Sequence, residues 1–379
     1  MSGSADTVAG TFRTPRQPID FPEQRDRDQM AKDRVTAQDV ALRAGVSQSA
    51  VSRVFTEGAS VSPKTEEKVR EAAAELGYRP NVLARSLITG RSRLIGLVVA
   101  YLDNQFYTKV LENLSSALQR EGYHVLIFMT SQTDDNLEEI LEQILDYQVD
   151  GIIAASVDLS SALAAKCQSA GIPVVLFNRN QDDERLSAVT SDNISGARKV
   201  ADFLVAGGHK TFGYIAGREG SSTQRDREAG FCDGLRNAGF ELCAREVGNY
   251  QFETARKAGF SMFSKPDYPE AVFVAGDHMA IAVMDVIRFE LGLRVPEDVS
   301  VVGYGDAPPA SWPAYNLTTV RQSADEMVAE TVGTLLAQIE DRGATPRRIA
   351  LDGPLVIRES ARKPARPVTT PPQGTAEYE

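Results

Sequence analysis

The pattern of apolar and polar residues changes near Leu94 and divides the chain into two regions. From about Thr36 to Leu87, apolar residues recur at helical spacing within short segments. After Leu94, runs of consecutive apolar residues alternate with segments of helical period. Continuous apolar strands between amphipathic helices are typical of parallel sheets covered on both faces. The pattern predicts a small all-α domain followed by an α/β core.

The second region contains several apolar runs that are long enough to be buried strands, and their number suits two sheets better than one. The expected strands are 94–100, 124–130, 151–156, 173–178, 212–217, 271–276 and 300–305. Helical patterns lie between most of them, including 107–121, 136–148, 195–206, 225–238 and 278–291.

The first region begins with two short helices whose ends carry local signals. Thr36 is suited to cap the first helix, with Asp39 as its acidic partner three residues on. Gly45 is suited to the left-handed turn that ends this helix. Ser47 then caps a second helix, from Gln48 to about residue 56. A helix, a tight turn and a second helix form the helix-turn-helix pattern, whose second helix lies in a DNA major groove.

A third helix is expected from Ser62 and Pro63 to Gly77, because proline is tolerated at the first helical position. The apolar residues that face inward from the first two helices are Val40, Ala41, Ala44, Val51, Val54 and Phe55. We interpret this region as a DNA-reading domain. The alternative is an ordinary three-helix domain with a solvated basic face.

The charge of the chain is unevenly distributed. The full chain of 379 residues carries a net charge of −11, which by itself argues against a nucleic-acid binder. Residues 34–93, however, contain ten Lys or Arg and six Asp or Glu, a net +4, which leaves −15 for the remainder. A basic N-terminal region joined to an acidic remainder suits a protein in which only the N-terminal region contacts DNA phosphates.

Composition indicates a cytoplasmic protein of two or three domains. Apolar residues make up 42% and charged residues 25% of the chain, as in ordinary globular proteins. No apolar run approaches the roughly 20 residues needed to span a bilayer, and the N-terminus lacks the apolar segment of a secretion signal. Cys167, Cys232 and Cys243 are too far apart for a metal-binding pair. We therefore expect neither a membrane segment nor a cofactor.

Both ends of the chain are polar. Residues 1–34 have no apolar period and are expected to be a disordered tail, and residues 361–379 a loose, Pro- and Thr-rich one. The segment that begins at Met30 is similar to a usual start of the family named below, so the true initiator is either Met1 or Met30.

Several linked motifs resemble the lactose-repressor and galactose-repressor family of bacterial transcription regulators. They are DVA at 39–41, AGVS at 44–47, VSRV at 51–54, GYRPN at 77–81 and ARSL at 84–87. The resemblance continues from LIGLVV at 94–99 to LVIRES at 355–360. It implies a helix-turn-helix headpiece and a two-lobed α/β core like that of periplasmic sugar-binding proteins, with two parallel sheets flanked by helices.

The resemblance also implies domain boundaries. The headpiece is expected at 35–80, a hinge helix and linker at 81–93, and the effector-binding and dimerisation core at 94–360. Because the chain should cross between lobes near 192, 321 and 342, the first lobe would comprise about 94–191 and 322–341. The second would comprise about 192–321 and 342–360.

Gln48, Ser49 and Arg53 are the expected base-reading residues. Gln48 and Ser49 open the second helix, the end that meets base edges in helix-turn-helix docking. Gln can bond to adenine through both amide atoms, and Arg53 matches a family arginine that can reach guanine. The residues expected to contact phosphate through small donors are Thr36, Ser47, Ser52 and Asn81.

The segment 81–87 resembles the family's hinge helix. Seven residues are too few for a stable isolated helix, so a second copy and DNA would supply the missing packing. In the family these paired helices enter the minor groove, and a leucine that corresponds to Leu87 wedges between base pairs. Ala84 belongs to the same DNA-contacting segment. The alternative is a linker whose leucine packs on the core.

An effector is expected beyond the carboxyl ends of the strands, where open α/β sheets bind ligands. Polar and aromatic residues at these positions, or at matching family positions, are Phe106, Tyr107, Asn178, Arg179, Arg227, Tyr250, Asp277 and Asp306. Phe106 and Tyr107 could stack on a ring, or pack in the core. Arg227 matches a family arginine whose fixed donors suit paired hydroxyls or a carboxylate.

Two positions depart from the family pattern. Gly276 precedes Asp277 where the family commonly has Asn, and Gly305 precedes Asp306 where it commonly has Asp. Two side chains that usually grip sugar hydroxyls are therefore missing. Either the ligand is not a typical pyranose, or it is bulkier and fills the space, or no small molecule binds.

No catalytic motif is recognisable. The histidines His124, His209 and His278 lack metal-site spacing, and no nucleophile elbow or phosphate-binding glycine motif follows a strand. We therefore expect a homodimeric regulator, not an enzyme, that binds a pseudo-palindromic operator under the control of a small-molecule effector. Residues after 363 show no leucine heptads, which favours a dimer over a tetramer. The alternatives are a solute-binding module of the same core fold and a regulator without an effector.

Overall fold

The computed structural model describes residues 35–56, 59–79, 91–100, 104–130, 137–157 and 159–365. The chain forms two compact units, one up to Ile88 and one from Thr89 onward. The predicted hinge residues Asn81, Ala84 and Leu87 and both expected tails, apart from 361–365, lie outside the described residues. Among the described helices, none is long and apolar enough to cross a membrane.

The small unit contains three helices, α2 (Ala37–Ala44), α3 (Gln48–Val54) and α4 (Pro63–Leu76). Thr36 and Asp39 cap α2 reciprocally: the Asp39 backbone N–H donates to the Thr36 hydroxyl, and the Thr36 backbone N–H donates to the Asp39 carboxylate. Gly45 follows in the left-handed conformation, with φ of 65°. The turn between α2 and α3 therefore forms where the local signals place it.

The three helices bury one apolar core. Its fully buried members are Val40, Ala41, Val51, Val54, Val69, Ala72 and Ala73. Phe55 and Tyr78 pack against it with ring centroids 5.8 Å apart. The second helix ends at Val54, two residues before the expected end, although the Thr56 hydroxyl still donates to the Ser52 carbonyl.

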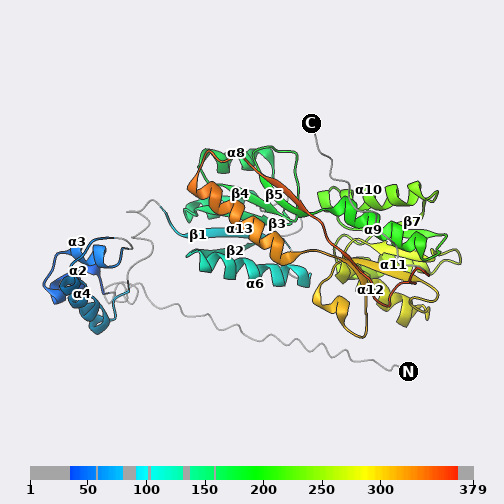
Figure 1. Ribbon diagram of the computed structural model, residues 1–379, viewed down its shortest axis with the longest axis horizontal. Helices are drawn as coiled ribbons and strands as arrows, with labels where there is room; N and C mark the ends of the chain where they lie inside the picture. The colour runs from blue at the N-terminus through cyan, green and yellow to red at the C-terminus, as the bar shows by residue number, and fades with distance from the viewer. Residues whose placement is uncertain are drawn as a thin grey trace, which may run out of the picture. The chain divides into compact units, whose positions relative to one another are not determined.

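The large unit contains two six-stranded sheets (Figure 1). The first has the order β11-β5-β4-β3-β1-β2, and its strand pairs are all parallel. The second has the order β12-β10-β9-β8-β6-β7, with only β12 antiparallel. The strands of the first sheet are β1 (Leu94–Val99), β2 (His124–Met129), β3 (Gly151–Ala155), β4 (Val174–Phe177), β5 (Ser187–Ser191) and β11 (Arg348–Leu351). Those of the second are β6 (Phe212–Ala216), β7 (Leu242–Val247), β8 (Ala271–Val274), β9 (Ser300–Gly305), β10 (Thr318–Arg321) and β12 (Leu355–Val356).

Helices cover both faces of the first sheet. Successive residues of a strand point to opposite faces, so neighbouring residues pack against different helices. Ile153 packs with α6 (Gln105–Arg120) and α13 (Ala324–Glu340), whereas Ile152 packs with α7 (Leu137–Asp146) and α8 (Ser161–Ser169). The second sheet shares one core with α9 (Asn193–Ala206), α10 (Ser222–Asn237), α11 (Phe252–Phe263) and α12 (Asp277–Asp285). A π-helix, Val286–Glu290, extends α12, and a 3-10 helix, Pro308–Ser311, follows β9. We call each sheet with its helices a lobe.

The chain passes between the lobes three times, and the third crossing differs from the prediction. The first two follow β5 and β10. The third follows β11 and occupies 352–354, because β11 still pairs with β5 of the first lobe. There the Lys199 ammonium on α9 binds Asp352 and the Gly353 carbonyl oxygen. The predicted crossing near 342 is therefore about ten residues too early, and 348–351 belongs to the first lobe.

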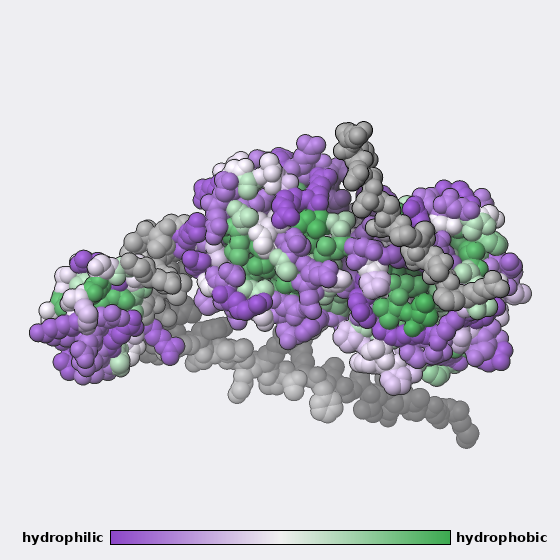
Figure 2. Space-filling view, in the orientation of Figure 1, coloured by the Kyte–Doolittle hydropathy of each residue, from purple (hydrophilic) through white to green (hydrophobic). Residues whose placement is uncertain are grey.

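The face seen in Figure 2 is mainly hydrophilic, with smaller apolar patches over the two lobes. Large exposed apolar side chains include Ile127 and Met129 on the edge strand β2. Phe289, in the π-helix of the second lobe, is 79% exposed. Single exposed apolar residues are common on protein surfaces.

Close packing of α9 against α10 generates a test of the second lobe. A Cβ at Gly230 would overlap the Ile194 carbonyl oxygen, which is backbone and cannot turn aside. Gly230→Ala should therefore destabilise the large unit by about 1–3 kcal/mol. Gly333→Ala is the matched control, because a Cβ on that helical glycine would meet no described atom within 4 Å outside its own helix backbone. This variant should gain about 0.5–1 kcal/mol. Urea denaturation of both variants measures this, and equal unfolding midpoints would contradict the packing argument.

Candidate functional site

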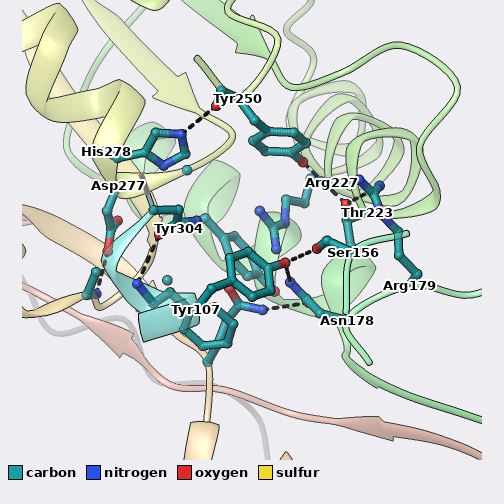
Figure 3. A pocket seen from close by; sticks show the side chains of 16 residues that line it. Tyr107, Ser156, Asn178, Arg179, Thr223, Arg227, Tyr250, Asp277, His278 and Tyr304 are labelled. Carbon is teal, nitrogen blue, oxygen red and sulfur yellow. Dashed lines mark hydrogen bonds between the residues drawn. The ribbon is translucent and has the colours of Figure 1, made fainter. Parts of the chain in front are cut away.

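A polar pocket lies between the two lobes, beyond the carboxyl ends of strands from both sheets (Figure 3). The first lobe contributes Asn104, Phe106, Tyr107, Ser156, Asn178 and Arg179, the second contributes Thr223, Arg227, Tyr250, Gly276, Asp277, His278, Tyr304, Gly305 and Ala307, and Gln322 follows β10. With its open mouth the pocket contains about 490 Å³ of empty space. This is the position at which open α/β sheets bind ligands.

Seven of the eight residues predicted to bind an effector line this pocket: Phe106, Tyr107, Asn178, Arg179, Arg227, Tyr250 and Asp277. Their contact with a ligand stays a prediction. Asp306 is placed differently, because its carboxylate forms ion pairs with Arg321 at 2.7 Å and Arg358 at 2.6 Å. These pairs tie the loop after β9 to the second crossing and to the C-terminal segment. Asp306 is not among the residues that line the pocket, and its contact with an effector stays a prediction.

The first-lobe wall is a chain of buried side-chain hydrogen bonds. The Tyr107 hydroxyl pairs with the Ser156 hydroxyl and accepts from the Asn178 amide at 2.7 Å. The Gln322 amide then donates to the Asn178 amide oxygen at 2.9 Å. Phe106 supports this wall from the core, edge-on to Tyr107 and stacked near Phe177. Tyr107 and Asn178 are therefore held in fixed positions.

Arg227 lies at the centre of the second-lobe wall and is 3% exposed. Its Nε donates to the Asn193 amide oxygen at 2.8 Å, and its Nη1 donates to the Ala275 carbonyl at 2.5 Å. Its guanidinium carbon lies 3.7 Å from the centre of the Tyr304 ring, in a cation–π contact. Nη2 has no hydrogen-bond partner among the described residues. One donor of this buried cation is therefore unpaired within the described part of the chain.

Direct hydrogen bonds join the lobes beside the pocket. Arg179 Nη1 donates to the Thr223 hydroxyl at 3.1 Å, and the Asn180 backbone N–H donates to the Ser222 hydroxyl at 2.9 Å. The Thr223 hydroxyl also lies 3.3 Å from the Tyr250 hydroxyl. A ligand that contacts Tyr250 or Arg179 therefore touches the groups that hold the two lobes together.

Asp277 is buried, and each of its carboxylate oxygens accepts a hydrogen bond from another described residue. One oxygen accepts from the Thr319 hydroxyl at 2.6 Å, and the other accepts from the Ala307 backbone N–H at 2.8 Å. Burial raises the pKa of Asp277 from 3.8 to about 6, against the lowering effect of these bonds. The carboxyl joins strand β10 to the loop after β9.

Four residues at strand ends adopt the left-handed conformation that non-glycine residues rarely take. Ser156 and Asn178 each have φ of 57°, and Tyr250 and Asp306 each have φ of 55°. Three of them line the pocket, and Asp306 adjoins it. Such backbone strain clusters at functional sites, where surrounding structure must hold it in place. Its concentration here supports the pocket as the functional centre of the core.

Sequence reasoning missed six polar lining residues, and one of them, Asn104, is the N-cap of α6. Ser156 and Gln322 directly follow β3 and β10, so the search beyond strand ends could have found them once β10 had been recognised. Thr223 lies in the first turn of α10, and His278 follows the predicted Asp277. Tyr304 points inward from the end of β9, a position that only the packing of Arg227 reveals.

The two glycines that depart from the family pattern differ in their surroundings. A Cβ at Gly276 would meet the His278 ring at an ordinary 3.4 Å. Gly305 has φ of 142°, and a Cβ there would lie 3.2 Å from an Asp277 oxygen. A side chain therefore fits at 276 and is strained at 305.

In the small unit, α3 presents the expected base-reading side chains. Gln48, Ser49 and Arg53 are exposed, and Ser52 is half-buried. Ser47 and Thr36, the expected phosphate contacts, are exposed but serve as helix caps: Ser47 accepts from the Ala50 N–H, and Thr36 donates its hydroxyl to Asp39. Contact of these residues with DNA stays a prediction.

The raised pKa of Asp277 predicts a pH-dependent stability. Because the folded carboxyl keeps its proton up to about pH 6, whereas the unfolded one loses it near 3.8, the folded state binds more protons between these values. Its stabilising contribution is complete below about pH 4 and is lost as pH rises through 6, by about 3 kcal/mol. Asp277→Asn does not titrate. The free energy of unfolding, measured from pH 4 to 7, should therefore fall in the parent relative to this variant. Parallel curves would refute the raised pKa.

Comparison with known proteins places both units in one family. Residues 36–81 match the model of bacterial regulatory proteins, lacI family, and residues 201–361 match a periplasmic binding protein-like domain. The chain is 32% identical to the HTH-type transcriptional regulator CelR of Thermobifida fusca, over 86% of this chain and 98% of that protein. It is 30% identical to the HTH-type transcriptional repressor PurR of Vibrio vulnificus (strain CMCP6), over 86% and 99%.

Solved structures agree with this placement. The lac repressor dimer bound to operator and the anti-inducer ONPF has a TM-score of 0.78 at 30% identity, with 86% of this chain and 99% of that chain covered. The complex of the transcriptional regulator CelR with cellobiose has a TM-score of 0.66 at 31% identity, with 86% and 100% covered. The chain belongs to the lacI family of bacterial regulatory proteins.

Proposed function

We propose that this protein is a transcriptional repressor that binds a pseudo-palindromic operator as a homodimer, and that a small molecule in the interlobe pocket controls its affinity for DNA. The observation that carries the proposal is the presence, in one chain, of a helix-turn-helix with an exposed second helix and of a buried polar pocket between two lobes. One element reads DNA, and the other receives the signal.

The DNA-binding half is supported by the side chains on α3. Gln48 and Ser49 lie at the N-terminal end of the helix that enters the major groove in this motif, and Arg53 lies about one turn further on. Glutamine and arginine offer the paired donors and acceptors that distinguish bases. The similar lac repressor was solved as a dimer on its operator. Two copies of α3 related by a two-fold axis require a two-fold symmetric site.

The effector half is supported by the position and chemistry of the pocket. It lies beyond strand ends of both sheets, and cross-lobe hydrogen bonds at Arg179 and Asn180 adjoin it. A ligand that prefers one lobe arrangement shifts the population toward it. The similar CelR was solved with cellobiose, a small molecule of the expected kind.

The competing functions are less well supported. A solute-binding module of the same core fold has no use for a helix-turn-helix, and residues 36–81 match a regulatory family. The named relatives are transcription regulators, which supports a regulator and not an enzyme. A regulator acts where DNA is, so we place the protein in the bacterial cytoplasm. A regulator without an effector is the remaining alternative, which the strained, cation-containing pocket disfavours.

Selection of bound sequences from random double-stranded DNA tests the DNA-binding half. The full chain should enrich a two-fold symmetric site. Arg53→Ala should weaken binding to that site about 10- to 100-fold and relax base preference at one position of each half-site, since a good base contact contributes about 1–3 kcal/mol.

Arg70→Ala is the control, because it removes the same charge from the exposed face of α4, where Arg70 pairs with Glu66. It should leave base preference unchanged. Failure of the full chain to enrich any symmetric site would refute the proposal, and unchanged preference in Arg53→Ala would remove Arg53 from the reading surface.

A further inference from the structure

The pocket contains more buried cationic groups than carboxylates. Arg179 and Arg227 both line it and are 1% and 3% exposed. Asp277 is the only carboxylic acid among the described lining residues. The walls therefore carry a net positive charge.

Arg227 lacks a charged partner among the described residues. The groups that hold it are an amide oxygen, a backbone carbonyl and an aromatic ring, all neutral. Arg227 lines the pocket, and its Nη2 is buried without a hydrogen-bond partner among the residues that the structure describes. A buried guanidinium is stabilised most by a negatively charged acceptor, which also satisfies the donor that is left over.

Several amide and carboxylate oxygens in the walls already accept hydrogen bonds from the protein. The two oxygens of Asp277 accept from Thr319 and Ala307, the amide oxygen of Asn178 accepts from Gln322, and that of Asn104 accepts from the Phe106 N–H. A neutral sugar brings hydroxyl hydrogens that each need an acceptor when buried. An anionic group brings only acceptors. The two guanidinium groups among the lining side chains are charged donors, which suit a ligand with anionic acceptor oxygens.

Position 276 contributes no side chain to the pocket wall, although neither backbone conformation nor packing requires glycine there. Its backbone is extended, and a Cβ there makes ordinary contact with the His278 ring. A polar side chain at 276 would fit beside this ring and face the pocket. Its absence leaves His278 and Arg227 as neighbours of the ligand on this side.

We infer, on the basis of the function proposed above, that the controlling ligand is an anionic small molecule whose carboxylate or phosphate binds Arg227 Nη2. The class comprises sugar acids and sugar phosphates. The guanidinium supplies the charge, and the fixed Tyr107–Asn178–Gln322 chain orients the polar remainder of the molecule.

The test compares compounds that differ only in the anionic group. Glucose, glucuronate and glucose 6-phosphate form one set, and galactose, galacturonate and galactose 1-phosphate form another. Binding to the full-length protein is measured by isothermal titration calorimetry and by the shift in melting temperature. At least one acid or phosphate should bind, and its neutral parent should bind at least tenfold more weakly. Whether the acid or the phosphate of a set binds shows which anionic group the pocket accepts.

Two substitutions at one position isolate the charge. Gly276→Asp and Gly276→Asn introduce side chains of nearly equal size where a Cβ fits, so both should fold. Relative to Gly276→Asn, Gly276→Asp should weaken the anionic ligand at least tenfold, because a like charge within several Å is strongly unfavourable at a buried site. Arg227→Gln should abolish the preference for the anion over its neutral parent.

Three results would overturn the inference: equal or tighter binding of the neutral parents, equal affinity of Gly276→Asp and Gly276→Asn for the anion, or no binding by any anionic member. Operator selection is measured separately without ligand. A protein that selects an operator but fails these tests retains the proposed DNA-binding function and loses the anionic ligand. A protein that binds the anion but selects no operator loses the proposed function instead.

Discussion

The buried guanidinium of Arg227 is the interaction on which the arrangement of the core depends. Its partners come from three places: Asn193 at the start of α9, the Ala275 carbonyl after β8, and the Tyr304 ring on β9. Asn193 in turn donates to the Ser191 carbonyl, at the first crossing between the lobes. Hydrogen bonds through Asn193 therefore connect Arg227 to the point where the chain passes from one lobe to the other. Pocket and crossing are connected through two side chains.

The cross-lobe contacts explain how occupancy can change the arrangement of the lobes. Arg179 with Thr223 and Asn180 with Ser222 are polar contacts between lobes, and each typically contributes only about 1 kcal/mol net. Bonds of this size hold a closed arrangement without locking it. A ligand that adds or replaces one or two of them can shift the equilibrium between open and closed lobes by the few kcal/mol typical of allosteric coupling.

Much of this organisation was predictable from local sequence signals, and the failures have physical reasons. The ends of α2 and α4 follow from Thr36, Gly45 and Gly77, because caps and left-handed turns depend on a few adjacent residues. The third crossing was misplaced because β11 is a four-residue edge strand with half-exposed residues, which gives no continuous apolar run. Asp306 was assigned to the pocket from its place after a strand. Its pairing with Arg358, 52 residues away, is tertiary and has no local signal.

The two departures from the family pattern have different meanings, and only the structure separates them. At Gly305 the backbone requires a conformation that side chains resist, and Asp277 occupies the adjacent space, so loop geometry alone accounts for glycine. Gly276 has extended backbone and room for a side chain, so neither strain nor packing accounts for it. A residue that folding leaves unconstrained, at the wall of a pocket, is free to vary with the ligand. Position 276, beside His278 and next to the Ala275 carbonyl that binds Arg227, is therefore a wall position that neither backbone geometry nor packing reserves for glycine.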